Sequence, residues 1–134
     1  MDSAEQDPLP LLLVVDAANV MGSVPDGWWR DRAGAARRLR DRLVRVASEG
    51  FGAEPEPVEV LLVVEGAARD TEPVPGVRVA AAPPGVSGDD EIVRAVAERE
   101  PAGRAVTVVT ADRELRARVG ELGASVLGPR AVPR

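Results

Sequence analysis

The feature that most constrains the fold is an alternation of short apolar runs with longer segments of helical periodicity. The first run, LLLVV at residues 11–15, is apolar without interruption, which is typical of a strand that is buried on both faces. Between such runs, apolar residues recur every three or four positions, as on the buried side of a helix. We expect strands at residues 9–15, 58–64, 77–81, 105–109 and 125–127, and helices at 28–48, 89–99 and 113–122.

This alternation predicts an α/β fold, in which a parallel sheet carries helices on both sides because its crossovers are right-handed. The length of 134 residues is that of one domain with a substantial core. We expect a single domain at residues 9–128, with flexible tails at residues 1–8 and 129–134.

The composition excludes several kinds of chemistry. The chain has no Cys, His, Tyr or Lys. Thiolate catalysis, a histidine general base, Schiff-base chemistry and a Lys-containing phosphate loop are therefore excluded. What remains is carboxylates, hydroxyls, amides and arginines, which suit catalysis by a metal ion with oxygen ligands. The net charge of −5 argues against a purely electrostatic nucleic-acid binder.

Acidic residues follow several of the expected strands. Asp16, Glu65 and Asp112 come at or just after strand ends, and Asp89 and Asp90 begin a helix. In a parallel sheet the strand ends and the following helix starts lie at one edge, where ligands bind. Each acid alone also has a structural explanation, as a helix cap or a partner of the helix dipole.

As a group, these acids are harder to explain structurally. Two carboxylates about 4 Å apart repel by roughly 4 kcal/mol at an effective dielectric constant near 20. Such a cluster requires a cation or raised pKa values, and Mg²⁺ or Mn²⁺ is the simplest solution. A metal that activates water suits phosphodiester hydrolysis, and Asn19 would orient the water or a phosphate oxygen.

Three segments resemble the signature segments of NYN domains, which belong to the PIN-like nuclease superfamily. They are VVDAANVMG, SGDDEIV and VVTADREL, and they occur in order within residues 11–127. The resemblance implies a Rossmann-like three-layer sandwich with a mostly parallel sheet of about five strands. It also implies Mg²⁺ or Mn²⁺ as cofactor and RNA as substrate. Asp16, Asp90 and Asp112 match the metal-binding positions.

Four further residues match positions that the resemblance associates with catalysis. Asn19 matches the asparagine that follows the first aspartate, and Asp89 matches an extra acid that some relatives carry. Thr110 takes the hydroxyl position before Asp112, and Glu65 stands where some relatives have an acid after the second strand. The catalytic set is therefore expected to be Asp16, Asn19, Asp89, Asp90 and Asp112, with Glu65 and Thr110 as additions.

The segment 30–45 contains seven arginines, which either bind phosphates or form a solvated helix face. Arg30 and Arg32 come nearest to the expected cleft, so we expect these two to contact RNA. Trp28 either stacks on a base or covers the start of the helix, and Trp29 falls in the apolar stripe of the helix, which places it in the core.

The sequence thus favours a metal-dependent ribonuclease that hydrolyses RNA at an acidic Mg²⁺ or Mn²⁺ site. The alternative is a catalytically weak module of NYN type that binds RNA or a protein. A receiver domain is excluded because there is no Lys. Acids precede the first apolar run and no run is long enough to span a bilayer, so we expect a cytoplasmic protein without a membrane partner. The sequence does not decide whether the protein forms a homodimer or belongs to a larger RNA-processing complex.

Overall fold

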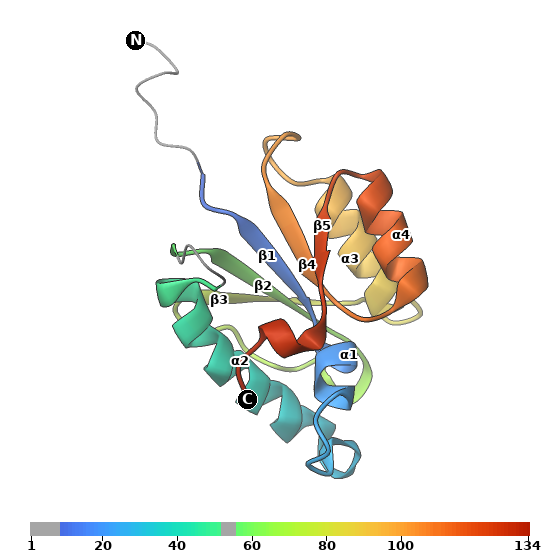
Figure 1. The fold of residues 1–134 in the computed structure, drawn as a ribbon. Coiled ribbons are helices and arrows are strands. Elements are labelled where there is room, and N and C mark those ends of the chain that lie inside the picture. The colour runs from blue at the N-terminus through green and yellow to red at the C-terminus, as the bar shows by residue number, and fades with distance from the viewer. Residues whose placement is uncertain (1–8, 52–55) are drawn as a thin grey trace.

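Five parallel strands form the centre of the molecule (Figure 1), a computed structural model that describes residues 9–51 and 56–134. The strands follow the order β3-β2-β1-β4-β5, and each neighbouring pair is parallel. Their bounds are β1 Leu12–Asp16, β2 Glu59–Val64, β3 Val77–Ala81, β4 Val106–Val109 and β5 Ser125–Leu127. The expected parallel α/β sheet is confirmed. Strand β1 begins later than expected because Leu9 is exposed to solvent and Pro10 has no N–H to donate.

Helices cover both faces of the sheet, which makes three layers (Figure 1). Helices α1, Ala17–Gly22, and α2, Arg32–Glu49, pack on one face, and helices α3, Gly88–Ala97, and α4, Arg113–Glu121, pack on the other. Each face has its own apolar core. Fully buried side chains from the helices include Leu39 in the first core, and Ile92 and Leu115 in the second.

The order of the strands reverses next to β1. The chain runs outward from β1 through β2 to β3 and then returns to β4 on the other side of β1. Asp16 is paired with Val63 of β2, and Val15 with Val109 of β4, so the carboxyl ends of the three strands lie together. Parallel α/β sheets bind ligands at such a reversal.

The expected helix at 28–48 differs at its start. Residues Trp28–Arg30 form a single 3₁₀ turn, and α2 begins at Arg32. Asp31 is the reason, because its side chain accepts a hydrogen bond from the N–H of Gly34 at 2.9 Å and so caps the helix there. Trp29 therefore lies outside the apolar stripe and is 55% exposed, so its expected place in the core is wrong.

Residues 129–134, which the sequence predicts to be a flexible tail, pack against the domain in the structure. Residues Pro129–Ala131 form a 3₁₀ turn, and Val132 is buried in the core beneath α2. Arg42 donates to the carbonyl of Pro133 at 3.0 Å, and Arg134 donates to the carbonyl of Ser23 at 3.2 Å. An isolated valine gave no sign in the sequence that it completes a core. Residues 1–8, the other expected tail, lie outside the described residues.

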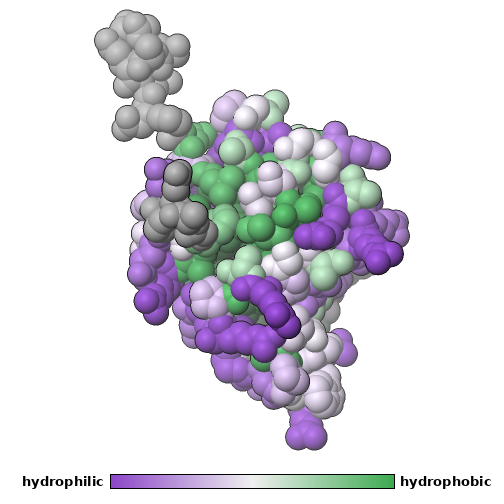
Figure 2. All heavy atoms as spheres, in the orientation of Figure 1, coloured by the Kyte–Doolittle hydropathy of each residue, from purple (hydrophilic) through white to green (hydrophobic). Residues whose placement is uncertain are grey.

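The surface over α2 is strongly polar. Figure 2 shows hydrophilic side chains along this part of the molecule, in keeping with the arginine-rich sequence of the helix. In the part of the chain that the structure describes, none of the helices combines the length and the apolar character that a bilayer crossing requires.

Candidate functional site

Asp16 is the buried centre of the site. It ends β1 and caps α1, and it is 5% exposed. One carboxylate oxygen, Oδ1, accepts a hydrogen bond from the N–H of Asn19 at 3.3 Å. The other, Oδ2, accepts one from the hydroxyl of Thr110 at 2.9 Å. Both oxygens are therefore held in place by groups from two different elements.

A short hydrogen-bond network joins the end of β1 to the end of β4. The fully buried hydroxyl of Thr110 also accepts from the N–H of Asp112 at 3.1 Å. The side-chain oxygen of Asn19 accepts from the N–H of Ala111 at 2.9 Å. Asp112 in turn caps α4 by accepting from the N–H of Leu115 at 2.9 Å. The structural role of Asp112 as a cap and its place at the candidate site are therefore compatible.

Glu65 approaches the start of α3 closely. Its carboxylate accepts a hydrogen bond from the N–H of Gly88 at 2.7 Å. A Cβ atom at position 88 would lie 3.1 Å from the carboxyl carbon of Glu65, so the glycine makes room for this contact. The contact brings Glu65, from the end of β2, next to the helix that carries Asp89.

The acids form one electrostatic cluster. Burial raises the pKa of Asp16, against the hydrogen bonds from Thr110 and Asn19, and the charges of Asp89 and Glu65 raise it further. Burial also raises the pKa of Asp89, with additional contributions from the charges of Asp112 and Glu65. Because these carboxylates influence one another, a cation among them would lower the free energy of the ionised site.

The structure brings Asp89, rather than Asp90, into this cluster. The side chain of Asp90 is 59% exposed and forms an ion pair with Arg118 of α4 at 3.0 Å. The motif matched Asp90 to a metal-binding position and made Asp89 the extra acid, whereas in the structure it is the charge of Asp89 that acts on Asp16. The sequence interpretation also missed Arg118, whose charge lowers the pKa of Asp89. Only the packing of α4 against α3 reveals it, because no motif marks this position.

The donor atoms at the site suit a hard cation, although no three of them are preassembled. Within residues 9–51 and 56–134, no group of three acidic side chains is arranged as a ready set of metal ligands. Mg²⁺ commonly binds through one or two carboxylates and completes its coordination with water and substrate phosphates. Asp16 and Asp89 are chemically suited to such a site, with Asp112 and Glu65 nearby.

The two tryptophans lie differently from each other. Trp28 is half-buried against the core, and the guanidinium of Arg32 lies 5.3 Å from the centre of its ring. Trp29 meets Trp28 edge to face, and Arg30 lies 5.7 Å from its ring centre. Trp28 borders the candidate site, whereas Trp29 and Arg30 extend away from it into solvent.

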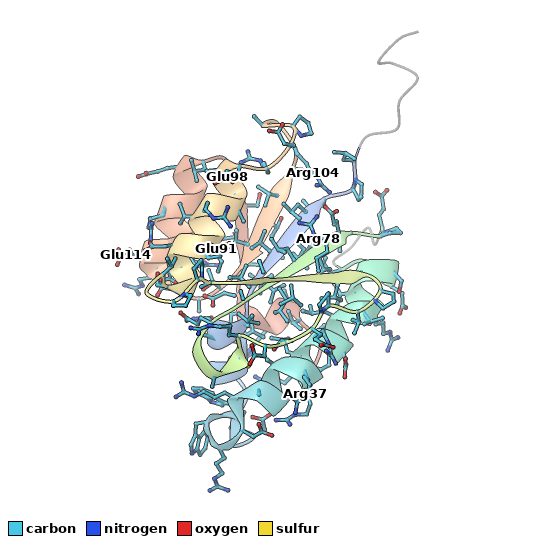
Figure 3. All side chains as sticks on the ribbon, turned by 180° about the vertical axis from the view of Figure 1, so that it is seen from behind. Arg37, Arg78, Glu91, Glu98, Arg104 and Glu114 are labelled. Carbon is cyan, nitrogen blue, oxygen red and sulfur yellow. The ribbon has the colours of Figure 1, made fainter. Side chains whose placement is uncertain are left out.

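A pocket of about 380 Å³ adjoins the acidic cluster. It lies between α1, the ring of Trp28, Ala111 and Pro129, and Asn19 forms part of its wall. Another pocket, of about 420 Å³, lies at the opposite end of the strands. Its charged lining, which includes Arg78, Arg104, Glu91 and Glu98, is visible from behind (Figure 3). Because that lining mixes both signs of charge and contains none of the expected site residues, the smaller pocket is the more relevant one.

The raised pKa of Asp89 predicts an unusual pH dependence of stability. The folded protein holds the Asp89 proton more tightly than the unfolded chain, so this contribution to stability is lost as the pH rises through the folded-state pKa. Without divalent metal at pH 7, Asp89→Asn is expected to raise the free energy of unfolding, and the gain should shrink as the pH falls toward 3.8, the usual carboxyl value. Urea denaturation at several pH values measures this effect. Asp41→Asn, at an exposed aspartate on α2, is the control, and an equal gain in that variant would contradict the prediction.

The hydroxyl of Thr110 is expected to stabilise the folded protein as well as to position the carboxylate of Asp16. Thr110→Val leaves Asp16 Oδ2 and the N–H of Asp112 without this partner in a buried place, which is expected to cost about 1–3 kcal/mol. Thermal or chemical unfolding measures the loss. The control is Thr107→Val in β4, the strand that ends just before Thr110, because Thr107 is also a buried threonine but has no contact with Asp16 in the hydrogen-bond network. Equal losses in both variants would show that the network at Asp16 contributes nothing specific.

Comparison with known proteins supports the fold. No family model matches the sequence, and no curated protein is detectably similar to it. Among solved structures, Rae1 (YacP) from Bacillus subtilis is similar, with a TM-score of 0.69 and 18% identity over 90% of this chain and 70% of that chain. A mutant of Rae1 gives a TM-score of 0.73 and 18% identity over 90% of this chain and 71% of that chain. At this level of identity the comparison shows that this chain shares the α/β fold of Rae1.

Proposed function

We propose that this protein is a metal-dependent ribonuclease, in which Mg²⁺ or Mn²⁺ binds at Asp16 and Asp89 and RNA phosphodiester bonds are hydrolysed. The observation that carries the proposal is the buried carboxylate of Asp16 at the reversal of the strand order. It shares its surroundings with Asp89 and Glu65, and no ion pair of Asp16 with an arginine is found among residues 9–51 and 56–134. A divalent cation would balance the negative charge of such a site.

The chemistry divides between the metal and the protein. A bound divalent cation supplies an activated water and offsets negative charge on the phosphate. The protein holds Asp16 fixed through Thr110 and the N–H of Asn19, so that its carboxylate needs little reorganisation. Asp112 and Glu65 add negative charge around the cation, which strengthens its binding.

Asn19 and two arginines are suited to hold the RNA. The side-chain oxygen of Asn19 is occupied by the N–H of Ala111, so its amide nitrogen remains to donate to a phosphate oxygen or to water. Arg118, which pairs with Asp90, and Arg32 beside Trp28 supply positive charge for neighbouring phosphates. Arg30 is a weaker candidate, because it lies over the exposed Trp29.

The test is cleavage of single-stranded and hairpin RNAs by the purified protein with Mn²⁺, with Mg²⁺ and with a chelator. Asp16→Asn should abolish metal-dependent cleavage, and Asp41→Asn, an exposed aspartate on α2, should cleave like the wild type. Cleavage that is equal in the wild type and in Asp16→Asn would contradict the proposal. Loss of cleavage in Asp41→Asn as well would show that the assay does not report on this site.

A second candidate is a catalytically weak NYN-type module that binds RNA or a protein. One observation favours it, namely that no ready set of three metal ligands exists among the described residues. In addition, Asp112 and Glu65 each use a carboxylate oxygen to accept a hydrogen bond from a backbone N–H group, so that oxygen is less available to a metal ion. RNA binding and Mn²⁺ binding by calorimetry, without cleavage of any RNA tested, would favour this candidate over the ribonuclease.

A further inference from the structure

We propose that the pocket beside Asn19 receives a single unpaired nucleobase of the RNA. This inference rests on the proposed function, because it takes RNA to be the ligand. The volume of about 380 Å³ falls within the range of roughly 300–1,000 Å³ that is typical of small-molecule pockets.

The walls of the pocket suit a flat aromatic ring. One wall is the indole of Trp28, which packs partly against the core and meets Trp29 edge to face. The other walls are formed by small side chains, including Ala18 and Ala111, and by Gly22, which has no side chain at all. Aromatic side chains stack on any nucleobase, and small residues leave room for the ring.

The border of the pocket carries polar groups. Asn19 contributes its amide, and Ser23 contributes a hydroxyl that donates to the carbonyl of Val20 at 2.6 Å and so offers its lone pairs. Polar groups placed this sparsely among apolar walls are typical of sites that orient a ligand. The guanidinium of Arg32, on the face of Trp28, adds positive charge for the phosphate of the bound nucleotide.

The pocket is continuous with the acidic cluster. Asn19 and Ala111 line the pocket, and the hydrogen bond between them links the segments that carry Asp16 and Asp112. A nucleotide whose base enters the pocket would thus contact the segments that carry Asp16 and Asp112. A base within a duplex would first have to leave its stack, at a cost of a few kcal/mol, so unpaired segments are preferred.

Gly22 offers a way to fill the pocket without altering Trp28. Its backbone is helical, and an added Cβ would lie 3.7 Å from the indole, which is an ordinary contact. A longer side chain must then extend into the pocket. Gly22→Leu is therefore the blocking variant. Gly120→Leu is the matched control, because Gly120 lies in α4 and an added Cβ there meets nothing within 4 Å.

The experiment measures binding without cleavage. The chain contains two Trp and no Tyr, so in a Trp29→Phe background the fluorescence comes from Trp28 alone. The protein is titrated in chelator with an unstructured eight-nucleotide RNA and with the same RNA in a duplex. We expect the single strand to quench Trp28 and to bind at least tenfold more tightly than the duplex. We also expect Gly22→Leu to weaken single-strand binding about tenfold or more, since stacking is lost, and Gly120→Leu to leave it unchanged.

The outcomes separate this inference from the ribonuclease proposal. Equal affinity for single strand and duplex, no binding of either, or unchanged binding by Gly22→Leu would overturn the pocket assignment. If circular dichroism shows that Gly22→Leu does not fold, Trp28→Leu is used in the same titration, followed by fluorescence anisotropy of labelled RNA, with the same expected loss. RNA that quenches Trp28 but is not cut with Mn²⁺ would contradict the ribonuclease and leave the pocket assignment intact. RNA that is cut equally by the wild type and by Gly22→Leu would contradict the pocket assignment and leave the ribonuclease proposal intact.

Discussion

Asp89→Asn is expected to lower the rate of metal-dependent RNA cleavage about 100-fold or more, whereas Asp90→Asn should stay within about tenfold of the wild type. The two residues are neighbours in the first turn of α3, but only Asp89 belongs to the acidic cluster with Asp16. Asp90 is instead paired with Arg118 at the surface. The kcat/KM of a short RNA, measured over a range of Mn²⁺ concentrations, gives both the rate and the apparent metal affinity.

The metal titration adds a second criterion. Loss of a carboxylate ligand should raise the Mn²⁺ concentration required for half-maximal activity in Asp89→Asn, with little change in Asp90→Asn. The reverse ranking would show that Asp90 turns toward the metal, as the motif alone suggested. Asp89→Asn should also be the more stable protein without metal, so lost activity in this variant cannot be explained by unfolding.

Ile92→Ala should be among the most destabilising single substitutions, with an expected loss of about 2–5 kcal/mol. Ile92 is fully buried in the core between the sheet and α3, and its truncation leaves a cavity there. A loss of this size is a large part of a total stability of about 5–15 kcal/mol. Because Ile92 lies one turn after Asp89, a loosened α3 should also weaken Mn²⁺ binding.

Urea denaturation followed by circular dichroism measures the loss at Ile92. The control is Val44→Ala on α2, where the side chain is 39% exposed and a change within about 0.5 kcal/mol is expected. A loss below about 1 kcal/mol at Ile92 would mean that the core closes around the missing atoms, which the packing of α3 against the sheet argues against.

The architecture could be predicted from the sequence because strands and helices leave patterns among residues that are close together in the chain. These patterns are the uninterrupted apolar runs and the helical periodicity. The sequence also identified the residues that meet at the strand ends, since parallel topology forces Asp16 and Asp112 to one edge. It could not distinguish Asp89 from Asp90, because adjacent residues at a helix start differ by about 100° in direction, and only the packing of α3 against α4 decides which one faces the cluster.

Two other features escaped prediction for related reasons. The exposure of Trp29 depends on where α2 begins, and that is decided by the capping hydrogen bond of Asp31 rather than by periodicity. The burial of Val132 depends on contacts with segments that are distant in the chain, such as Arg42 on α2. The proposed base pocket belongs to the same class, because Gly22, Trp28, Ala111 and Pro129 converge only in three dimensions.

The placement of Val132 has a consequence for the synthesis of the protein. The core beneath α2 is built from β1, β2 and α2, yet it is completed by residues near position 132. A nascent chain that has reached β5 can form the whole sheet, but the α2 face still lacks Val132 and the contacts of Arg42 and Arg134. During translation, the packing of the α2 face should therefore be completed only after residues 132–134 have emerged.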